Sequence, residues 1–304
     1  MSCQTTCCGV FAAAVTPLNL SGGIESESVP VYLGFLAERG CHGALLLGTT
    51  GEGPSFSHAE RVKLMQAAVT VRQQHPRFRL LAGTGTPSLE ETIANTRSAF
   101  DIGMDGVVVL PPYYYRNASD DGLYEWFYQL IKRAVPLDGS LFGYHIPSLS
   151  GVPLSVDLVS RLKDAFPHRF SGLKDSSSSP EHAVLLGKLF GKDLTILNGN
   201  DKLFSIALEA GASGCITAMA SLCSPLLRRV WDAHLRGNSD PVAQQVLDSS
   251  RAIMDKHPPA PPLVKSILAV QHQFPRWSVR PPLLDLTHDA QNVIAAELES
   301  ACNV

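Results

Sequence analysis

The sequence predicts an α/β protein, namely a (β/α)8 TIM barrel with additional C-terminal helices. Eight short apolar runs occur between residues 10 and 217, and their starts lie 19 to 36 residues apart, which leaves room for a loop and a crossover helix. Apolar residues continue through each run instead of alternating with polar ones, as in parallel strands that are buried on both faces. The segments between the runs carry helical periodicity.

The eight apolar runs fall within the first 220 residues. A (β/α)8 barrel usually takes about 250 residues, so the number of units and their length agree. A doubly wound open sheet is the rival fold, but its G-x-G-x-x-G sequence does not follow the first run. The predicted strands are residues 10–15, 44–47, 80–83, 106–110, 141–146, 170–174, 195–197 and 214–217.

The segments between these strands contain start and stop signals of helices. Residues 57–60 (Ser-His-Ala-Glu) and 88–91 (Ser-Leu-Glu-Glu) are both capping-box patterns. In the helix after the first pattern, Val62, Met65 and Val69 recur at helical spacing and are expected to face the core. Four glycines fall where helices should end: Gly40, Gly103, Gly191 and Gly211.

Residues 221–304 contain no comparable strand-like run. We expect them to form a helical extension packed on the barrel of residues 1–220. The run His-Pro-Pro-Ala-Pro-Pro at 257–262 should separate two helices, because proline cannot continue a helix. Helices are predicted around residues 225–235, 242–255, 263–271 and 289–300.

Composition excludes several classes of protein. The chain is 45% hydrophobic and 17% charged, which is typical of a compact enzyme-like protein. Its net charge is −3 and it has no run of Lys or Arg, so we expect no nucleic-acid partner. It has no apolar segment of about 18 residues, which predicts no membrane span. Residues 1–5 do not begin a secretory signal, which predicts a cytoplasmic protein.

The cysteines show no pattern of a metal site or a disulfide framework. They are odd in number, scattered, and without a C-x-x-C pair, so we expect reduced thiols that act mostly as small core residues. Nothing in the sequence explains the adjacent Cys7 and Cys8. The seven cysteines are Cys3, Cys7, Cys8, Cys41, Cys215, Cys223 and Cys302.

One lysine stands at the end of a predicted buried strand. Strand 170–174 ends on Lys174, which Asp175 and four serines follow. Burial disfavours the charged form of a lysine, and a neutral lysine amine can attack a carbonyl and form a Schiff base. The alternative is a lysine that extends from the strand end to water. The other lysines, including Lys265, are expected to be ordinary helix-surface residues.

The side chains at the other strand ends limit the reactions in which Lys174 could take part. In such a barrel the active site lies at the carboxyl ends of the strands. Those ends supply hydroxyl groups and the backbone N–H groups of a glycine-rich turn at 48–53, but no cluster of His, Asp and Glu suited to a divalent metal. Tyr144 and His145 point to opposite faces of their strand, so only one of them can face the barrel centre. The set indicates Schiff-base chemistry without a metal.

Each of these features also has a purely structural interpretation. The turn at 48–53 could be a tight loop or a phosphate-binding turn, and the three tyrosines at 113–115 could form an aromatic patch at a subunit interface. Tyr144 could pack in the core with its hydroxyl satisfied. Asp201 could cap the following helix, and Asn200 could only shape the loop.

Three motifs together resemble a known family. They are residues 48–52 (Gly-Thr-Thr-Gly-Glu), residues 144–147 (Tyr-His-Ile-Pro) with Gly151, and residues 172–175 (Gly-Leu-Lys-Asp). In order and spacing they are similar to the signatures of the pyruvate-dependent class I aldolases. That family includes dihydrodipicolinate synthase, N-acetylneuraminate lyase and 2-keto-3-deoxy-sugar-acid aldolases. The resemblance runs from about Gly9 to the C-terminal helices.

The resemblance implies a role for each motif. Lys174 would form the imine with pyruvate, and Tyr144 would shuttle the proton. Thr49 and Thr50 would hold the pyruvate carboxylate, with Thr49 joining the proton relay. Tyr114 would be lent across a subunit interface in a homotetramer built as a dimer of dimers, without metal or organic cofactor. The substrate-binding residues would be Gly48, Thr50, Ser176, Gly199, Asn200 and Ile216.

Departures from the family patterns bear on the substrate. Dihydrodipicolinate synthases commonly carry an arginine just after the tyrosine motif, whereas this chain has Ser-Leu-Ser-Gly at 148–151; Arg116 could substitute. The Tyr-His-Ile-Pro form resembles sialic-acid lyases, but Lys202 stands where those tend to have an acidic residue. The residues Gly-Glu-Gly-Pro-Ser at 51–55 resemble the sugar-acid aldolases.

The expected function is therefore that of a lyase that reversibly cleaves a 2-keto-3-deoxy sugar acid to pyruvate and an aldehyde. The alternatives within the family are 4-hydroxy-tetrahydrodipicolinate (dihydrodipicolinate) synthase, which condenses pyruvate with aspartate semialdehyde, and N-acetylneuraminate lyase. A regulatory barrel that only binds a keto acid is the non-enzymatic alternative. The presence of Lys174, Tyr144 and Thr49 together argues against it.

Overall fold

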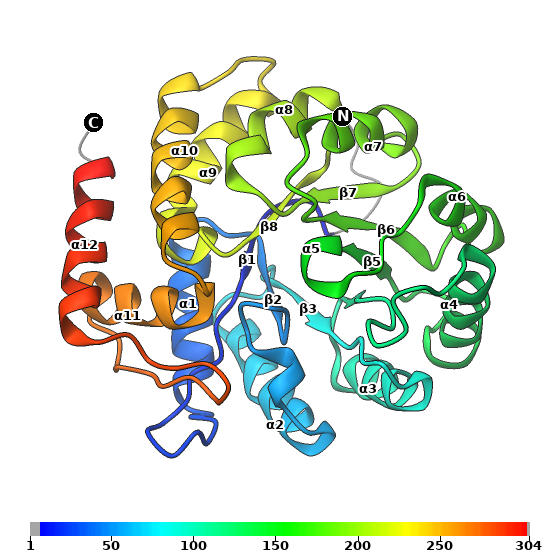
Figure 1. The fold of residues 1–304 in the computed structure, drawn as a ribbon, viewed down its shortest axis with the longest axis horizontal. Coiled ribbons are helices and arrows are strands. Elements are labelled where there is room, and N and C mark those ends of the chain that lie inside the picture. Colours follow the sequence, from blue (N-terminus) through cyan, green and yellow to red (C-terminus); the bar gives the residue numbers. More distant parts are fainter. Residues whose placement is uncertain (1–6, 303–304) are drawn as a thin grey trace.

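The computed structural model describes residues 7–302 and forms a closed barrel of eight parallel strands (Figure 1). The strands follow one another around the barrel in chain order, and the last pairs with the first. All eight predicted strands are confirmed within one or two residues at each end. They are β1 (Gly9–Ala13), β2 (Gly43–Leu46), β3 (Arg79–Gly83), β4 (Gly106–Val109), β5 (Leu141–His145), β6 (Phe170–Asp175), β7 (Thr195–Asn198) and β8 (Gly214–Thr217).

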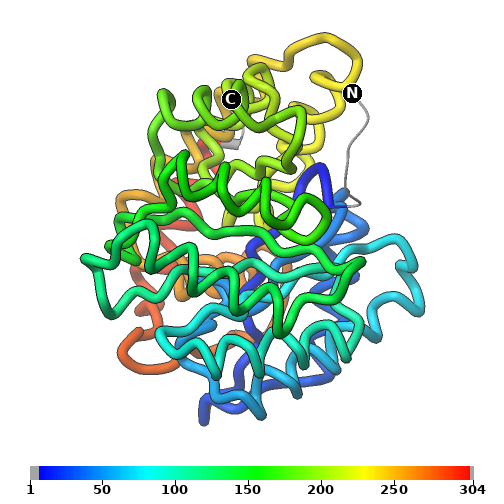
Figure 2. Tube along the Cα trace, turned by 90° about the vertical axis from the view of Figure 1, so that its right-hand side faces the viewer, coloured from blue at the N-terminus to red at the C-terminus, as the bar shows by residue number. Residues whose placement is uncertain are grey.

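Helices surround the barrel, and in the side view the cyan and green segments that include α3, α4 and α6 face the reader (Figure 2). They are α1 (Ser28–Glu38), α2 (His58–Val69), α3 (Leu89–Ile102), α4 (Asp120–Ala134), α5 (Pro147–Ser150), α6 (Val156–Ala165), α7 (Pro180–Phe190), α8 (Phe204–Ala210), α9 (Ala220–Leu235), α10 (Pro241–Lys256), α11 (Ala260–His272) and α12 (His288–Cys302). Short 3-10 helices occur at η1 (Gly53–Ser55), η2 (Thr70–Gln73) and η3 (Asp201–Leu203).

The strands are apolar throughout because both of their faces are buried. One set of side chains fills the barrel interior and includes Phe11, Leu45, Phe142 and Ile216. The other set packs between the strands and the helices. Tyr144 belongs to the interior set and His145 does not, as expected for adjacent residues that point to opposite faces of a strand.

The predicted helix ends are confirmed, with two refinements. Ser57 and Glu60 form a complete capping box, whereas at α3 only the serine half is present, with Ser88 accepting from the backbone of Glu91. Gly191 ends α7 without a left-handed conformation. A Cβ atom there would lie 2.5 Å from two backbone carbonyl oxygens, so close packing of α7 on α8 requires the glycine.

The buried face of α2 differs from the predicted one. Arg61, Leu64, Met65 and Ala68 are its buried residues, whereas the expected face ran through Val62 and Met65 to Val69. Met65 is buried as expected, and Val69 packs against the core, but Arg61 and Leu64 were not expected on this face. The Arg61 side chain is buried because its guanidinium donates to backbone carbonyl groups inside the protein.

The C-terminal helices lie where they were expected. Pro261 and Pro262 occupy the first turn of α11, where a missing N–H group costs no hydrogen bond. Helix α9 begins five residues earlier than predicted and carries Pro225 beside a kink at Cys223. Helix α10 packs on α9, and α12 packs on α10 and α11.

Cysteine chemistry differs in part from the expectation. Cys41 and Cys215 are buried thiols, and burial raises the pKa of Cys41 to about 12. Cys8 takes part in a disulfide bond, so the expectation of reduced thiols is wrong for that residue. Cys3 lies outside the described residues. No helix within residues 7–302 has the length and apolar character of a membrane span.

Candidate active site

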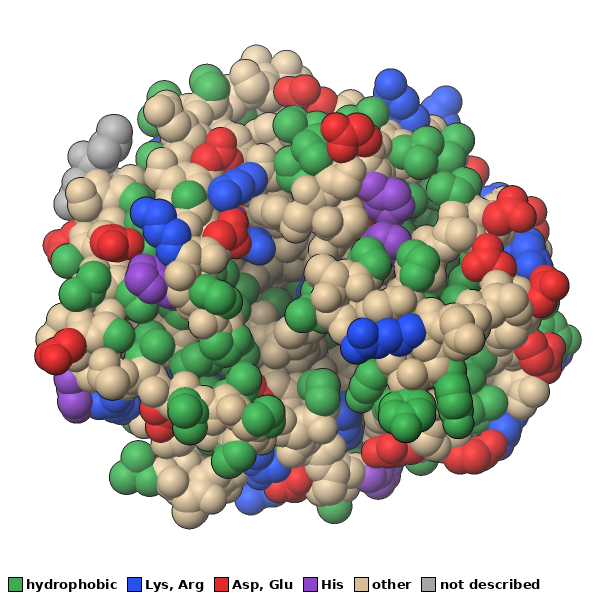
Figure 3. All heavy atoms as spheres, in the orientation of Figure 1, with side chains coloured by type: hydrophobic (Ala, Val, Ile, Leu, Met, Phe, Trp, Pro, Cys, Tyr) green, Lys and Arg blue, Asp and Glu red, His purple; other side chains and the backbone are tan. Residues whose placement is uncertain are grey.

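The carboxyl ends of β2, β5 and β6 bring Thr49, Tyr144 and Lys174 together. Tyr144 and Lys174 are partners in the strand register, and the Lys174 Nζ atom lies 4.2 Å from the centroid of the Tyr144 ring. The Tyr144 hydroxyl lies 3.3 Å from the Thr49 Oγ1 atom. Lys174 is 3% exposed and Tyr144 6%, while Thr49 is exposed. The molecule is hollowed near the centre of the face shown in Figure 3.

The surroundings of Tyr144 favour proton transfer. Burial raises the pKa of its phenol, but the positive charge of Lys174 and hydrogen bonds with Thr49, Lys174 and Ser176 outweigh that effect, so the pKa lies below its usual value. A phenol with a lowered pKa gives up and regains a proton more readily near neutral pH. The three side chains thus combine an amine nucleophile with a hydroxyl relay.

The turn that carries Thr49 and Thr50 is tightly constrained. Its two flanking residues, Leu47 and Glu52, both have φ of 57°, a left-handed conformation that non-glycine residues rarely adopt. The Gly53 N–H group donates to the carbonyl of Gly48 at 3.0 Å. A Cβ atom on Gly53 would collide with the carbonyl of Leu47, so this position requires glycine.

Arg61, on α2, donates hydrogen bonds that hold the turn at 48–53 in place. Its guanidinium donates to the carbonyls of Gly53 at 2.5 Å, Gly83 at 3.0 Å and Phe56 at 3.1 Å. On the other side the Thr16 hydroxyl donates to the carbonyl of Gly51 at 2.7 Å, from the end of β1. The predicted carboxylate-binding turn is therefore held by side chains from two neighbouring elements.

The interpretation of Lys265 as a surface residue is wrong. Its side chain is 1% exposed, and Nζ lies 2.5 Å from the Glu52 Oε1 atom and 2.6 Å from the carbonyl of Ser278. Burial lowers the pKa of Lys265, and the charge of Glu52 opposes that shift. Glu52, the last residue of the Gly-Thr-Thr-Gly-Glu motif, thus forms an ion pair with α11.

The ends of β6 and β7 place Ser176 beside Gly199. The Gly199 N–H group donates to the carbonyl of Asp175 at 2.7 Å, and a Cβ atom on Gly199 would collide with the Ser176 hydroxyl. A hydrogen bond with the Ser176 side chain helps to lower the pKa of Tyr144. Ile216, on β8, lies in the barrel interior.

The capping role considered for Asp201 belongs to Asn200. Asn200, not Asp201, is the N-cap of η3, where its side chain accepts from the Lys202 N–H group at 3.1 Å. Its amide also donates to Ser178 at 3.0 Å. Asp201 is fully buried and pairs with Arg251 at 3.2 Å.

Tyr114 is exposed on the surface of the chain. Its ring is 75% exposed and packs edge-on against Tyr115, with 5.2 Å between the ring centroids. Tyr115 is 70% exposed. This pair forms an aromatic patch on the surface of the β4–α4 loop.

Two cavities lie near opposite ends of the barrel. The smaller, of about 40 Å³, lies at the carboxyl ends of β2 to β5, and Thr49, Gly48 and Tyr144 belong to its lining. The larger, of about 540 Å³, is lined by residues of α7, α8 and α9, including Trp231, and by the starts of β7 and β8. None of the predicted site residues lines the larger cavity.

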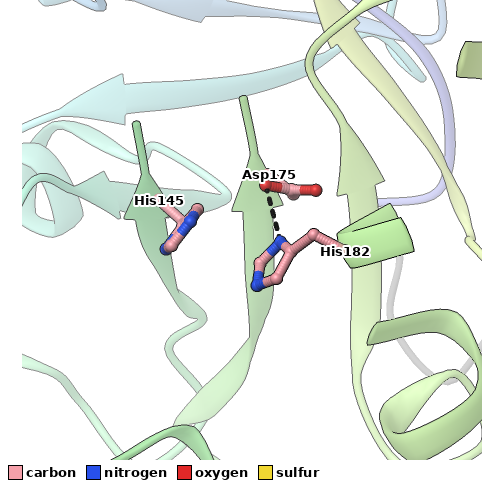
Figure 4. A group of neighbouring side chains, drawn as sticks. All are labelled: His145, Asp175 and His182. Atoms are coloured by element: carbon pink, nitrogen blue, oxygen red, sulfur yellow. Dashed lines mark ion pairs between the residues drawn. The ribbon is translucent and has the colours of Figure 1, made fainter. Parts of the chain in front are cut away.

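A cluster that the sequence did not reveal is formed by His145 on β5, Asp175 on β6 and His182 on α7 (Figure 4). His145, Asp175 and His182 each offer a ligand atom within 4.8 Å of the others. The His182 Nδ1 atom lies 3.2 Å from Asp175, and the two histidine rings stack with 4.5 Å between centroids.

The hydrogen bonds of this cluster favour a supporting role over a metal site. The Leu154 N–H group donates to the His145 Nδ1 atom at 3.0 Å. The proton of the neutral His145 ring is then on Nε2, so His145 has no lone pair left for a metal in this arrangement. Asp175 accepts from the Ser177 N–H group at 3.0 Å. The cluster thus joins β5, β6 and α7.

Acid should weaken this cluster through His145. Burial, followed by the charge of His182, lowers the His145 pKa from 6.5, so below pH 6.5 the unfolded chain binds more protons and stability falls. We expect His145→Asn, whose amide oxygen can still accept from Leu154, to lose less stability between about pH 7.5 and pH 5.5. Melting temperatures measured across that interval test this. Equal losses in the two proteins would contradict it.

Comparison with known proteins identifies the family. The model of the dihydrodipicolinate synthetase family matches residues 6–301. An uncharacterized DapA-like lyase of Chloroflexus aurantiacus is 37% identical over 96% of each chain, and a 4-hydroxy-tetrahydrodipicolinate synthase of Prochlorococcus marinus is 32% identical over 90% of this chain and 87% of its own. The crystal structure of dihydrodipicolinate synthase from Agrobacterium tumefaciens is 28% identical and superposes with a TM-score of 0.85 over 96% of this chain and 99% of that one.

The family match extends over the barrel and the C-terminal helices alike. The closed eight-stranded barrel and its helices agree with the same assignment. The chain therefore belongs to the dihydrodipicolinate synthetase family and is a carbon–carbon lyase of the pyruvate-dependent class I aldolase type.

Proposed function

We propose that the protein reversibly cleaves a 2-keto-3-deoxy sugar acid to pyruvate and an aldehyde through an imine on Lys174. The observation that carries the proposal is the contact of the Lys174 amine with the Tyr144 ring, whose hydroxyl continues to Thr49 at 3.3 Å. An amine and a hydroxyl relay within reach of one carbonyl carbon are what imine formation requires.

In the proposed reaction the Lys174 amine attacks the C2 carbonyl of the keto acid. Tyr144 passes the proton released by the amine to the carbonyl oxygen, which becomes a hydroxyl group. A second proton, taken up from solvent, lets this hydroxyl leave as water and leaves a protonated imine. The C3–C4 bond then breaks, its electron pair flows into the protonated imine, and Tyr144 accepts the proton of the C4 hydroxyl as the aldehyde forms. The resulting enamine is protonated at C3, and water releases pyruvate. The backbone N–H groups of Thr49 and Thr50 hold the carboxylate throughout.

The substrate proposal depends on the residues that would contact the aldehyde half. The α5 turn carries no positive charge, because residues 148–151 are Ser-Leu-Ser-Gly. Polar groups of Ser176 and Asn200 lie at the neighbouring strand ends. Neutral hydrogen-bonding groups suit the hydroxyl groups of a sugar chain better than a second carboxylate.

One observation favours a second candidate. The side chain of Arg116 lies against the α5 turn, since a Cβ atom on Gly151 would be 2.6 Å from the Arg116 Cδ atom. A guanidinium there could bind the carboxylate of aspartate semialdehyde. The relative in Prochlorococcus marinus is named 4-hydroxy-tetrahydrodipicolinate synthase. Condensation of pyruvate with aspartate semialdehyde is therefore the alternative.

A panel of substrates separates the two candidates. We expect pyruvate release from 2-keto-3-deoxy sugar acids to exceed both pyruvate release from N-acetylneuraminate and condensation with aspartate semialdehyde. Arg116→Ala should leave sugar-acid cleavage unchanged. The second candidate would be established instead if condensation with aspartate semialdehyde were the fastest reaction and if Arg116→Ala lowered its rate by about tenfold or more.

We propose that the working form is a homotetramer in which Tyr114 completes a neighbouring site. The exposure of Tyr114 and Tyr115 supports this, because exposed aromatic patches mark interaction surfaces. Sedimentation equilibrium should give four times the chain mass of 32.7 kDa, and a monomer would contradict the proposal. The cytoplasmic location remains a prediction.

A further inference from the structure

A segment of the C-terminal region crosses back over the loops at the mouth of the barrel. It consists of residues 277–280, which we call the strap, and it lies in the orange-red connection between α11 and α12 (Figure 1). The Trp277 Nε1–H group donates to Glu25 at 3.1 Å, and the Ser278 N–H group donates to the carbonyl of Leu18 at 3.1 Å. The strap is thus bonded to the loop between β1 and α1.

Arg280 continues these contacts to the loop between β2 and α2. Its guanidinium donates to the carbonyl of Ser55 at 2.9 Å, the carbonyl of Gly22 at 2.7 Å and the carboxylate of Glu60 at 2.6 Å. Its backbone N–H group donates to the Glu52 Oε2 atom at 2.8 Å. The strap therefore contacts the turn that carries Thr49 through a single acidic side chain.

Both carboxylate oxygens of Glu52 bind the C-terminal region. Oε1 pairs with Lys265 on α11 and Oε2 accepts from Arg280, and neither the Glu52 nor the Lys265 side chain is exposed beyond 1%. The backbone of Glu52 belongs to the turn, because its N–H group donates to the carbonyl of Thr49 at 3.1 Å. A shift of the Glu52 side chain would therefore move Thr49 and Thr50.

Two features of Glu52 are unfavourable in isolation. Its backbone is left-handed, and its carboxylate and the Lys265 ammonium are both removed from water. Buried ion pairs often stabilise a fold no better than apolar residues of the same volume. Such a pair is explained more readily by the geometry that it imposes than by stability.

We propose that the Glu52–Lys265 pair and the strap are a positioning device for the carboxylate-binding turn, so that Glu52 and Lys265 are positioning residues for the reaction. The inference rests on the proposed function, because it assumes that Thr49 and Thr50 hold the keto-acid carboxylate. Two residues of the C-terminal region, Lys265 and Arg280, lie 213 and 228 positions along the chain from Glu52 and thereby set the affinity for pyruvate.

The test measures the pyruvate concentration that gives half-maximal borohydride trapping on Lys174. Glu52→Gln combined with Lys265→Met removes both charges together, so that no buried ion is left alone. In this double variant we expect the half-maximal pyruvate concentration to rise by about tenfold or more. The trapping rate at saturating pyruvate should change less. Lys265→Met alone, which leaves the turn sequence intact, should change the concentration in the same direction.

Asp105→Asn is the matched control. Asp105 accepts from Arg72 at 2.5 Å, Arg79 at 2.9 Å and the Leu80 N–H group at 2.7 Å, but it precedes β4 at the opposite end of the barrel. Loss of the Asp105 negative charge should lower the melting temperature and leave the half-maximal pyruvate concentration unchanged. An equal increase in the control would show general destabilisation and overturn the inference.

The outcomes also separate this inference from the proposed function. A wild-type protein that traps no pyruvate would overturn both. A wild-type protein that traps pyruvate, with folded Lys265→Met and double variants that trap it at the same concentration, would overturn the positioning role alone. Circular dichroism at the assay temperature establishes that each variant is folded.

Discussion

Replacing Lys174 with methionine is expected to lower pyruvate release by about four orders of magnitude or more, because the variant lacks the amine that is proposed to form the imine. Methionine matches the lysine stem in length and leaves the barrel packed. Since Lys174 is 3% exposed, loss of its charge should also raise the melting temperature by about 2 °C or more. A coupled assay for pyruvate and a thermal melt measure the two effects.

Lys132→Met, on the exposed face of α4, is the control and should change neither quantity. Retention of more than about one hundredth of the wild-type rate in Lys174→Met would contradict imine catalysis at this residue. A rate loss accompanied by unfolding would instead show that Lys174 is needed for the fold.

Replacing Tyr144 with phenylalanine is expected to lower kcat by about 10² to 10⁴, the contribution of one positioned acid–base group. The ring that packs under Lys174 remains, while the hydroxyl that lies 3.3 Å from Thr49 is lost. The half-saturating pyruvate concentration should change far less than kcat, because the backbone N–H groups proposed to hold the carboxylate, those of Thr49 and Thr50, remain. Steady-state kinetics over a range of pH measures both quantities.

Tyr32→Phe provides a matched loss of a buried phenol hydroxyl. The Tyr32 hydroxyl lies 2.8 Å from Ser221, at the start of α9. This variant should lose stability without losing kcat. If Tyr144→Phe keeps the wild-type kcat and the same pH profile, the proton relay does not run through Tyr144.

Local patterns were enough to predict the strands and the three central side chains. Strands buried on both faces are continuously apolar, so the sequence indicated where each strand ends. The carboxyl-end rule then gave a list that contained Lys174, Tyr144 and Thr49, and the resemblance to the family assigned their roles. Gly53 belongs to the glycine-rich turn at 48–53 that the sequence analysis identified. The structure explains this glycine, because its backbone approaches Leu47 too closely for a side chain.

Contacts between distant residues could not be predicted in this way. Lys265 was expected on the surface because its partner, Glu52, lies 213 residues away and no local pattern links them. Arg61 was missed because its acceptors are backbone carbonyls, which leave no trace in the sequence. His182 joins His145 and Asp175 only through the packing of α7, and their spacing matches no ligand motif.

The most direct test of the proposed chemistry is reduction with borohydride in the presence of pyruvate, followed by intact-mass and peptide analysis. The imine mechanism predicts one reduced pyruvate adduct per chain, located on Lys174 and absent when borohydride or pyruvate is omitted. No adduct, or an adduct on a different lysine such as Lys265 or Lys202, would contradict it.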